Sequence, residues 1–196
     1  MPTLDVRWLL PDGSGGGPIE GGTARVPGAL PGDRVRYAEV HRRGRTVHGV
    51  LDAVEIPSPS RCDPSCPWHV PCGGCDLAAL EPNARRQALA MVVQRAFRWA
   101  EPPEVVPSPR QVGHRARVKL AIEGGRVGYR GARSHDLAEI GDCLIARPEV
   151  RDAMARLRDW ANPETTEALA SVEVRSDGAR AVFAFHAARR GVQMEP

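Results

Sequence analysis

Residues 62–75 read CDPSCPWHVPCGGC, which places four cysteines in the spacing C-x3-C-x5-C-x2-C. Gly73 and Gly74 separate the last two cysteines. Because glycine carries no Cβ, a tight loop at this point can turn both thiolates toward one ion. Cysteines at such a spacing indicate a metal or cluster site rather than free buried thiols. The segment therefore predicts a metal-binding loop.

Two kinds of metal group fit this spacing. A zinc ion would be held tetrahedrally by the four thiolates of residues 62–75. An iron–sulfur cluster also needs four thiolates, and the C-x5-C-x2-C part plus one distant cysteine is one way to supply them. Cys143, the fifth cysteine of the chain, is that distant candidate, although a cysteine there also suits a small core position. Spacing alone leaves zinc and iron–sulfur open.

The composition is that of a globular protein. Its 196 residues suffice for one large domain or two small ones, and its formal net charge is +3. The chain has no run of about 18 apolar residues, which excludes a transmembrane helix. Its N-terminus lacks a basic segment followed by an apolar one, so we expect no signal peptide and a cytoplasmic location. Cysteines in that compartment rarely form disulfides, which again favours metal binding or catalysis.

Positive charge is concentrated in one part of the sequence. Residues 110–135 carry seven basic side chains against a single acid, Glu123, whereas residues 136–150 are net acidic. A local basic stripe is what a polyanion-binding face requires, because each phosphate contact releases counterions. A solvated basic face without a partner is the alternative, and charge alone does not decide between them.

Short strands are expected over the first 57 residues. Alternation predicts a strand over 3–10, the Gly-rich run 11–22 predicts a loop, and residues 34–41 and 46–54 predict a hairpin. Strands at this spacing favour a small OB-like β-barrel. Three arginines at the hairpin tip lie near an aromatic residue, which suits a nucleic-acid surface, although an exposed hairpin without a partner fits equally well. They are Arg42, Arg43 and Arg45.

The rest of the chain predicts a mixture of helices and hairpins. Pro82 suits the first turn of a helix, and its expected core stripe is Leu89, Val92, Val93, Ala96 and Phe97. Alternation before Gly124-Gly125 predicts a hairpin with one basic and one apolar face, in which Lys119 lies opposite Arg130. Facing like charges repel, so such a face calls for an explanation such as bound phosphate. A helix from residue 148 and a last hairpin over 172–185 follow.

These elements indicate an α+β fold in three parts. We expect a barrel over residues 1–57, a cysteine-rich segment over 58–81, and a central domain with a helix, a basic hairpin, a helix and a hairpin over 82–196.

The stretch from Arg61 to Cys75 resembles the iron–sulfur segment of the RNA (uracil-5-)-methyltransferases. The branch with an N-terminal TRAM domain, typified by the 23S rRNA 5-methyluridine enzymes, is the most similar. Residues 26–33 (VPGALPGD) resemble its TRAM barrel, and residues 114–117, 127–130 and 134–143 resemble its central domain. The resemblance implies a 4Fe-4S cluster, leaves Cys62 outside it, and implies RNA of the ribosomal type as partner. The implied cluster ligands are Cys66, Cys72, Cys75 and Cys143. We expect RNA contacts from Arg115, Arg117, Lys119 and Arg130, and secondarily from Arg42, Arg43 and Arg45.

The sequence also departs from that family. Members continue into an S-adenosylmethionine domain with a nucleophilic cysteine and a general base, whereas no such motif and no cysteine follow Cys143 here. Attack on C6 of uracil needs an activated thiolate. Ala78, Ala84 and Met91 stand where members usually carry Gln, an aromatic residue and Lys.

We therefore expect an RNA-binding, cluster-containing portion of such a methyltransferase that is inactive alone. S-adenosylmethionine would bind only through a missing or separate catalytic domain, and a separate catalytic chain is a candidate partner. The alternative is a zinc- or cluster-binding sensor or structural module with no role in RNA methylation.

Overall fold

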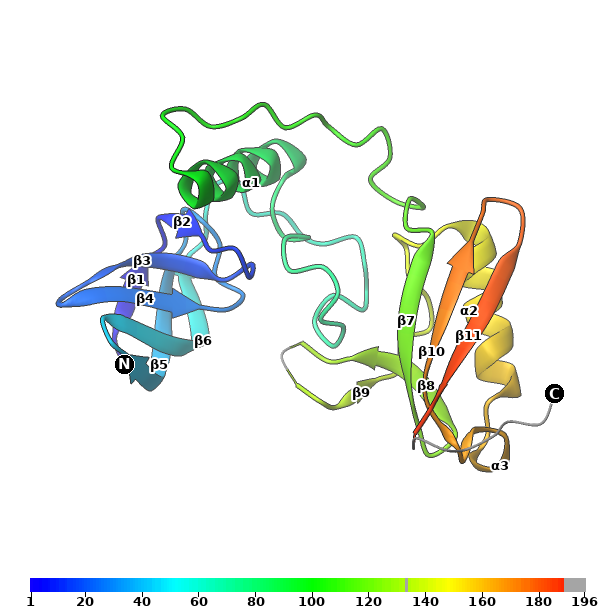
Figure 1. The fold of residues 1–196 in the computed structure, drawn as a ribbon. Coiled ribbons are helices and arrows are strands. Elements are labelled where there is room, and N and C mark those ends of the chain that lie inside the picture. Colours follow the sequence, from blue (N-terminus) through cyan, green and yellow to red (C-terminus); the bar gives the residue numbers. More distant parts are fainter. Residues whose placement is uncertain (133, 189–196) are drawn as a thin grey trace. The chain divides into compact units, whose positions relative to one another are not determined.

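The computed structural model describes residues 1–132 and 134–188 and has an α+β fold. It divides into two compact units, both drawn in Figure 1. Unit 1 comprises residues 1–64 and 76–107, and unit 2 comprises residues 65–75 and 108–196. None of the helices in the described ranges has the length and apolar character needed to cross a membrane.

A six-stranded sheet forms most of unit 1. Its strands are β1 (Thr3–Asp5), β2 (Trp8–Leu9), β3 (Gly15–Ile19), β4 (Gly22–Val26), β5 (Arg34–Arg43) and β6 (Thr46–Ile56). They are ordered β1-β5-β6-β4-β3-β2. Only Val6 and Arg7 join the two edge strands, so the sheet curls back on itself around an apolar core that includes Leu4, Val35 and Val47. The strand predicted over residues 3–10 is thus interrupted at its middle.

The middle of the glycine-rich run is a strand, so the loop predicted over residues 11–22 is wrong at residues 15–19, although residues 11–14 and 20–21 do lie outside strands. β3 pairs with both β2 and β4. A Cβ on Gly16 would lie 2.3 Å from the indole nitrogen of Trp8, and one on Gly17 would lie 2.3 Å from the carbonyl oxygen of Asp5. Glycine occurs here because neighbouring segments approach the strand closely. The hairpin predicted next along the chain is confirmed by β5 and β6.

Helix α1 (Pro82–Phe97) begins where proline predicts it, and its predicted core stripe is buried only in part, at Val92. Ala88 packs in a cluster with Leu80 and other residues of unit 1. Leu89 is 39% exposed and Phe97 is 66% exposed, so the predicted core stripe is wrong at both positions. The contacts come largely from small alanine side chains, which a search for large apolar residues overlooks.

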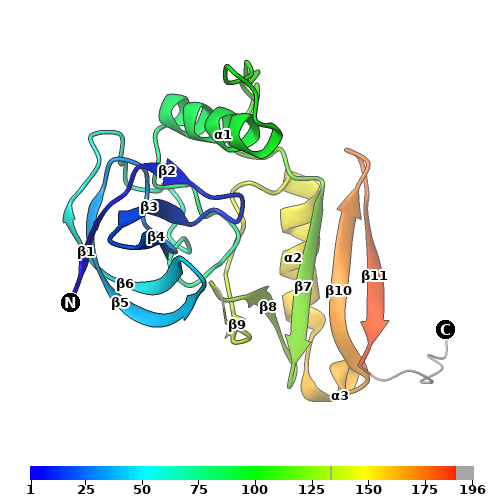
Figure 2. The ribbon, with the colours of Figure 1, turned by 60° about the vertical axis from the view of Figure 1, so that its left-hand side comes forward.

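Unit 2 contains a five-stranded sheet covered on one face by a helix. Its strands are β7 (Arg117–Glu123), β8 (Arg126–Arg130), β9 (Leu137–Ala138), β10 (Leu169–Ser176) and β11 (Ala181–Ala187). They are ordered β11-β10-β7-β8-β9. Helix α2 (Pro148–Trp160) lies along one face, as Figures 1 and 2 show, and the short α3 (Pro163–Thr166) precedes β10. Met154 and Leu157 of α2 pack against Val172 and the sheet.

The hairpin of β7 and β8 has the predicted turn and, near the turn, the predicted register, but the predicted pairing of Lys119 with Arg130 is not among its described pairs. Gly124 and Gly125 both have positive φ, which a two-residue turn of this kind requires. Ala121 pairs with Gly128, and residues closer to the turn pair in the same register. Val118 is buried while Lys119 is exposed, so the prediction of one apolar and one basic face is confirmed. The face of the sheet away from α2 is called the open face below.

The two units do not coincide with the boundaries expected at residues 57 and 81. Helix α1 belongs to unit 1 because Leu80 and Ala88 pack with Leu9 and Leu30. Residues 65–75 belong to unit 2, where Trp68 packs against the core. The chain passes between the units repeatedly, and sequence order alone does not reveal such an exchange of segments.

Candidate functional site

The four predicted cluster ligands all belong to unit 2. Cys72 forms an isolated β-bridge with Gly131, just after β8, and Trp68 packs against the unit-2 core. This contact attaches the segment 65–75 to the central sheet. Cys143 is 8% exposed within the same core. The thiols gathered in unit 2 are those of Cys66, Cys72, Cys75 and Cys143.

The four thiols of unit 2 lie near enough to one another to influence the pKa of Cys72 and of Cys75. Burial chiefly raises the pKa of Cys72; a backbone hydrogen bond at Gly74 opposes this, and the thiols of Cys143 and Cys66 add to it. Burial also raises the pKa of Cys75, opposed by the Arg115 guanidinium and reinforced by the other three thiols. A cation bound among the thiols would reverse this preference, because metals bind the deprotonated form.

Cys62 belongs to unit 1, whereas the other four cysteines belong to unit 2. Its backbone N–H donates to the carbonyl oxygen of Ala79 at 3.0 Å, and its sulfur lies 3.7 Å from the carbonyl oxygen of Ala78. The ligand set that leaves Cys62 out is therefore the set contained in a single unit.

The thiols of unit 2 have suitable chemistry for a thiolate-bound group but do not form a closed ligand shell. Within the described parts of the chain, no three Cys, His, Asp or Glu side chains converge closely enough to hold a metal ion. His69 Nδ1 is buried and lacks a hydrogen-bond partner among described residues, and the buried Tyr129 hydroxyl has the Cys143 thiol beside it. Burial chiefly raises the pKa of Tyr129, and the Cys143 thiol adds to the effect.

The open face of the unit-2 sheet is basic, and a buried carboxylate partly neutralises it. Glu173 of β10 is 4% exposed and accepts hydrogen bonds from Arg175 and, at 2.6 Å, from Arg117. These two guanidinium groups, Arg175 first, hold the pKa of Glu173 below its usual value. Glu173 thus offsets part of the repulsion between the like charges on adjoining strands, so a bound phosphate is not needed to offset all of it. Lys119 makes no ion pair with any described residue.

The remaining predicted contacts in unit 2 fall in two places. Arg130 pairs with Glu123 on the open face and donates to the carbonyl oxygen of His135 at 2.5 Å. Arg115, by contrast, is half-buried, and its charge acts on the thiols of Cys72 and Cys75. The hairpin pattern grouped Arg115 with Arg117 and Lys119, and it could not show this proximity to the thiols.

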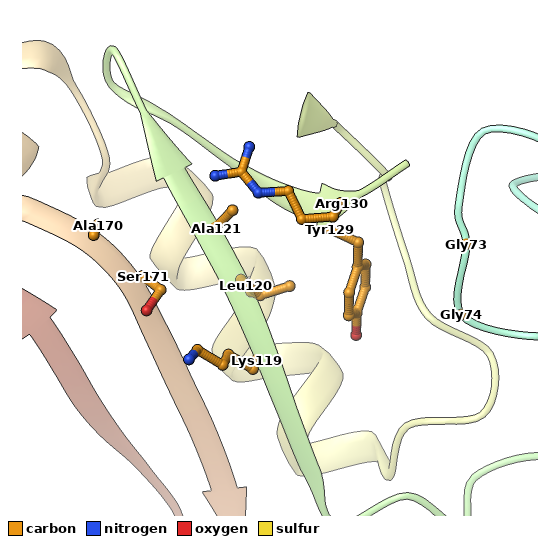
Figure 3. A pocket seen from close by; sticks show the side chains of 9 residues that line it. All are labelled: Gly73, Gly74, Lys119, Leu120, Ala121, Tyr129, Arg130, Ala170 and Ser171. Atoms are coloured by element: carbon orange, nitrogen blue, oxygen red, sulfur yellow. The ribbon is translucent and has the colours of Figure 1, made fainter. Parts of the chain in front are cut away.

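A cavity of about 540 Å³ opens beside β7 and β8, shown in Figure 3. The two strands are paired near their turn only as far as Ala121 and Gly128. The residues around the opening come from β7, β8, β10 and the loop between Cys72 and Cys75. They include Gly73, Gly74, Lys119, Tyr129, Arg130 and Ser171. No sequence pattern indicated this cavity.

The secondary RNA-contact candidates lie together at the far end of the β5–β6 hairpin in unit 1. Arg42 pairs with Glu39 at 3.6 Å, and Arg45 donates to the carbonyl oxygen of Gly21 at 3.4 Å. His41 and His48 stack beside them with ring centroids 4.3 Å apart. The tip is basic as predicted, and its contact with RNA stays a prediction.

Known proteins similar to this chain act on RNA. The 23S rRNA (uracil(1939)-C(5))-methyltransferase RlmD of Pectobacterium atrosepticum is 30% identical, over 80% of this chain and 37% of its own length. The enzyme of that name from Pseudomonas putida is 30% identical, over 94% of this chain and 44% of its own. The chain resembles the RNA (uracil-5-)-methyltransferases.

The structure of Pyrococcus abyssi tRNA (uracil-54, C5)-methyltransferase with S-adenosyl-L-homocysteine also resembles the chain. It matches 93% of this chain and 45% of its own, with a TM-score of 0.64 and 26% identity. No family model matches. The chain spans less than half the length of the two curated relatives named above, 37% and 44%.

Two stretches that carry the resemblance to these methyltransferases, 26–33 and 61–75, are joined in unit 1 by a buried ion pair. The Asp33 carboxylate is 2% exposed and accepts from Nε and Nη2 of Arg61 at 3.0 and 2.8 Å. It also accepts from the backbone N–H groups of Leu30 and Ser58 at 2.7 and 2.9 Å. Arg61 thereby anchors the start of the cysteine-rich segment. The sequence motifs contain both Asp33 and Arg61, but nothing in the sequence indicated that the two residues pair.

Proposed function

We propose that this chain is the RNA-recognising, cluster-containing part of a uracil-5 RNA methyltransferase with a ribosomal type of substrate. The observation that carries the proposal is the presence, in one unit, of four neighbouring thiols and an open sheet face bearing Arg117, Lys119 and Arg130. The similarity to 23S rRNA methyltransferases over both units supports it. A basic, solvent-facing sheet can hold a folded RNA by phosphate contacts and by shape.

We further propose that the curled sheet of unit 1 is a TRAM-type, OB-like barrel. Its two joined edge strands and its basic β5–β6 tip support this assignment. In such a barrel Arg42, Arg43 and Arg45 would add phosphate contacts to those made by unit 2.

The cluster assigned to this site is 4Fe-4S, with Cys66, Cys72, Cys75 and Cys143 as its ligands. When bound, it would cross-link the cysteine loop to the core position of Cys143. Its role would then be structural, because it would fix the loop that borders the open face. Arg115 would lie beside the thiolates and offset part of their negative charge.

Methyl transfer itself requires an activated thiolate nucleophile and bound S-adenosylmethionine. Four of the five cysteines are assigned to the cluster, and Cys62 is held against the backbone of unit 1. We therefore propose that these 196 residues do not methylate RNA unaided. Transfer of a radiolabelled methyl group to rRNA by the purified chain would overturn this.

The experiment that tests the proposal is titration of the anaerobically purified chain with structured rRNA fragments at several salt concentrations. We expect binding that weakens steeply as salt rises, because phosphate contacts release counterions. Absent or salt-independent binding would contradict the proposal. Metal content without RNA binding would instead favour the second candidate, a metal-binding sensor or structural module, which the internal neutralisation by Glu173 also allows.

A further inference from the structure

The cavity of Figure 3 exists because β7 and β8 diverge. Their ladder runs from the turn to Ala121 and Gly128, whereas Lys119 is paired in register only with β10. The edge of Lys119 and Leu120 that faces β8 is therefore free of described strand pairing. Backbone groups along such an edge can hydrogen-bond to the polar rim of a nucleobase. The volume, about 540 Å³, is within the range of about 300–1,000 Å³ typical of small-molecule sites.

The lining of this cavity combines a flat apolar wall with cations. The Tyr129 ring stands between β7 and the Gly73–Gly74 loop in Figure 3, and its buried hydroxyl lies beside the Cys143 thiol. Ser171 and Ala121 are directly paired across β10 and β7, so small side chains leave the open face hollow beside the cations. A planar base can enter such a space, because aromatic and small residues leave room for it to lie flat.

Charge is available in the cavity where a phosphate would need it. Lys119 lines it and makes no ion pair with a described residue, although the backbone of Glu173 lies opposite it in register. The Glu173 carboxylate is already occupied by Arg117 and Arg175. Arg130 also lines the cavity, and its charge is shared with Glu123. Lys119 is thus the cation most free to bind an anion there.

We propose that this cavity binds one unpaired nucleotide of the RNA, with its phosphate at Lys119 and its base against Tyr129 and the Gly73–Gly74 loop. The inference rests on the proposed function and deepens it, since it divides the open face into one nucleotide site and surrounding phosphate contacts. It predicts that unpaired RNA binds better than a duplex, because a base in a duplex is not free to enter.

The test compares a short oligouridylate with a blunt RNA duplex of equal length, by fluorescence anisotropy on the whole, anaerobically purified chain. We expect Lys119→Ala and the cavity-filling Ser171→Leu each to weaken oligouridylate binding about tenfold, with little effect on the duplex. Arg126→Ala is the matched control, because Arg126 lies on the same hairpin, pairs with Glu139 and is not among the lining residues. Circular dichroism confirms that each variant is folded.

Three other results would contradict the nucleotide site, and they can be told apart. Equal losses in Lys119→Ala and Arg126→Ala, with wild-type RNA binding intact, would reduce the cavity to part of a general basic face and leave the proposed function standing. No RNA binding by the wild type would defeat the proposed function as well. Saturable binding of uridine 5′-monophosphate without RNA binding would assign the cavity to a free nucleotide instead.

Discussion

Replacing Asp33 by alanine should destabilise unit 1 far more than an ordinary surface mutation. The substitution removes a carboxylate that is 2% exposed and accepts four hydrogen bonds. It leaves the Arg61 guanidinium without its buried partner and two backbone N–H groups without an acceptor. Removing one member of a buried pair costs about 3–5 kcal/mol. Asp33→Asn should cost less, because an amide oxygen can still accept some of these bonds.

Asp52→Ala is the matched control in the same sheet. Asp52 pairs with Arg36 at 2.5 Å, and both side chains are partly solvent-exposed, Asp52 at 34% and Arg36 at 43%. Such an exposed pair contributes little to stability, because solvent screens its charges. The two aspartates therefore test whether burial and hydrogen bonding, rather than charge pairing alone, determine the loss.

Native-state hydrogen exchange on β5 and β6 is the assay, because it reports on unit 1 separately and two units need not unfold together. We predict a large fall in the opening free energy of these strands for Asp33→Ala and little change for Asp52→Ala. Equal effects of the two substitutions would refute the claim that Asp33 holds the start of the cysteine-rich segment.

Two further outcomes follow from contacts described above. Glu173→Gln should lower the free energy of unfolding of unit 2 and make it depend less on pH in acid. Because the folded state lowers the pKa of Glu173, its carboxylate stabilises the fold fully above about pH 4.5, and this stabilisation is lost as pH falls through the folded-state pKa. Urea unfolding at several pH values measures both effects. Gly17→Ala should cost about 3 kcal/mol, because its Cβ would lie 2.3 Å from the carbonyl oxygen of Asp5, whereas Gly21→Ala, with open space but φ +74°, should cost about 1 kcal/mol; thermal unfolding distinguishes them.

Elements whose signals are local could be predicted from the sequence. The β7–β8 hairpin follows from alternation around Gly124-Gly125, and α2 begins at Pro148, where a helix was predicted. The α+β class follows from these elements together. Elements shaped by long-range packing could not be predicted in this way. Gly15–Ile19 has the composition of a loop and forms a strand because distant segments pass close to its backbone.

The candidate site shows the same contrast. Spacing could place Cys72 and Cys75 in one loop, and the family resemblance added Cys143, which unit 2 indeed contains. The half-buried place of Arg115 beside the thiols depends on tertiary structure, since alternation grouped it with exposed residues. The cavity at Lys119 depends on the divergence of two strands, for which local sequence carries no signal.

We propose above all that the four cysteines of unit 2 hold one iron–sulfur cluster. Anaerobic purification, visible absorption and iron, sulfide and zinc analysis of the wild type, Cys143→Ser and Cys62→Ser test it most directly. We predict a brown protein with iron and sulfide, both lost in Cys143→Ser and retained in Cys62→Ser. A colourless protein with one zinc, unchanged in Cys143→Ser and lost in Cys62→Ser, would contradict the claim and assign the metal to the four local thiolates.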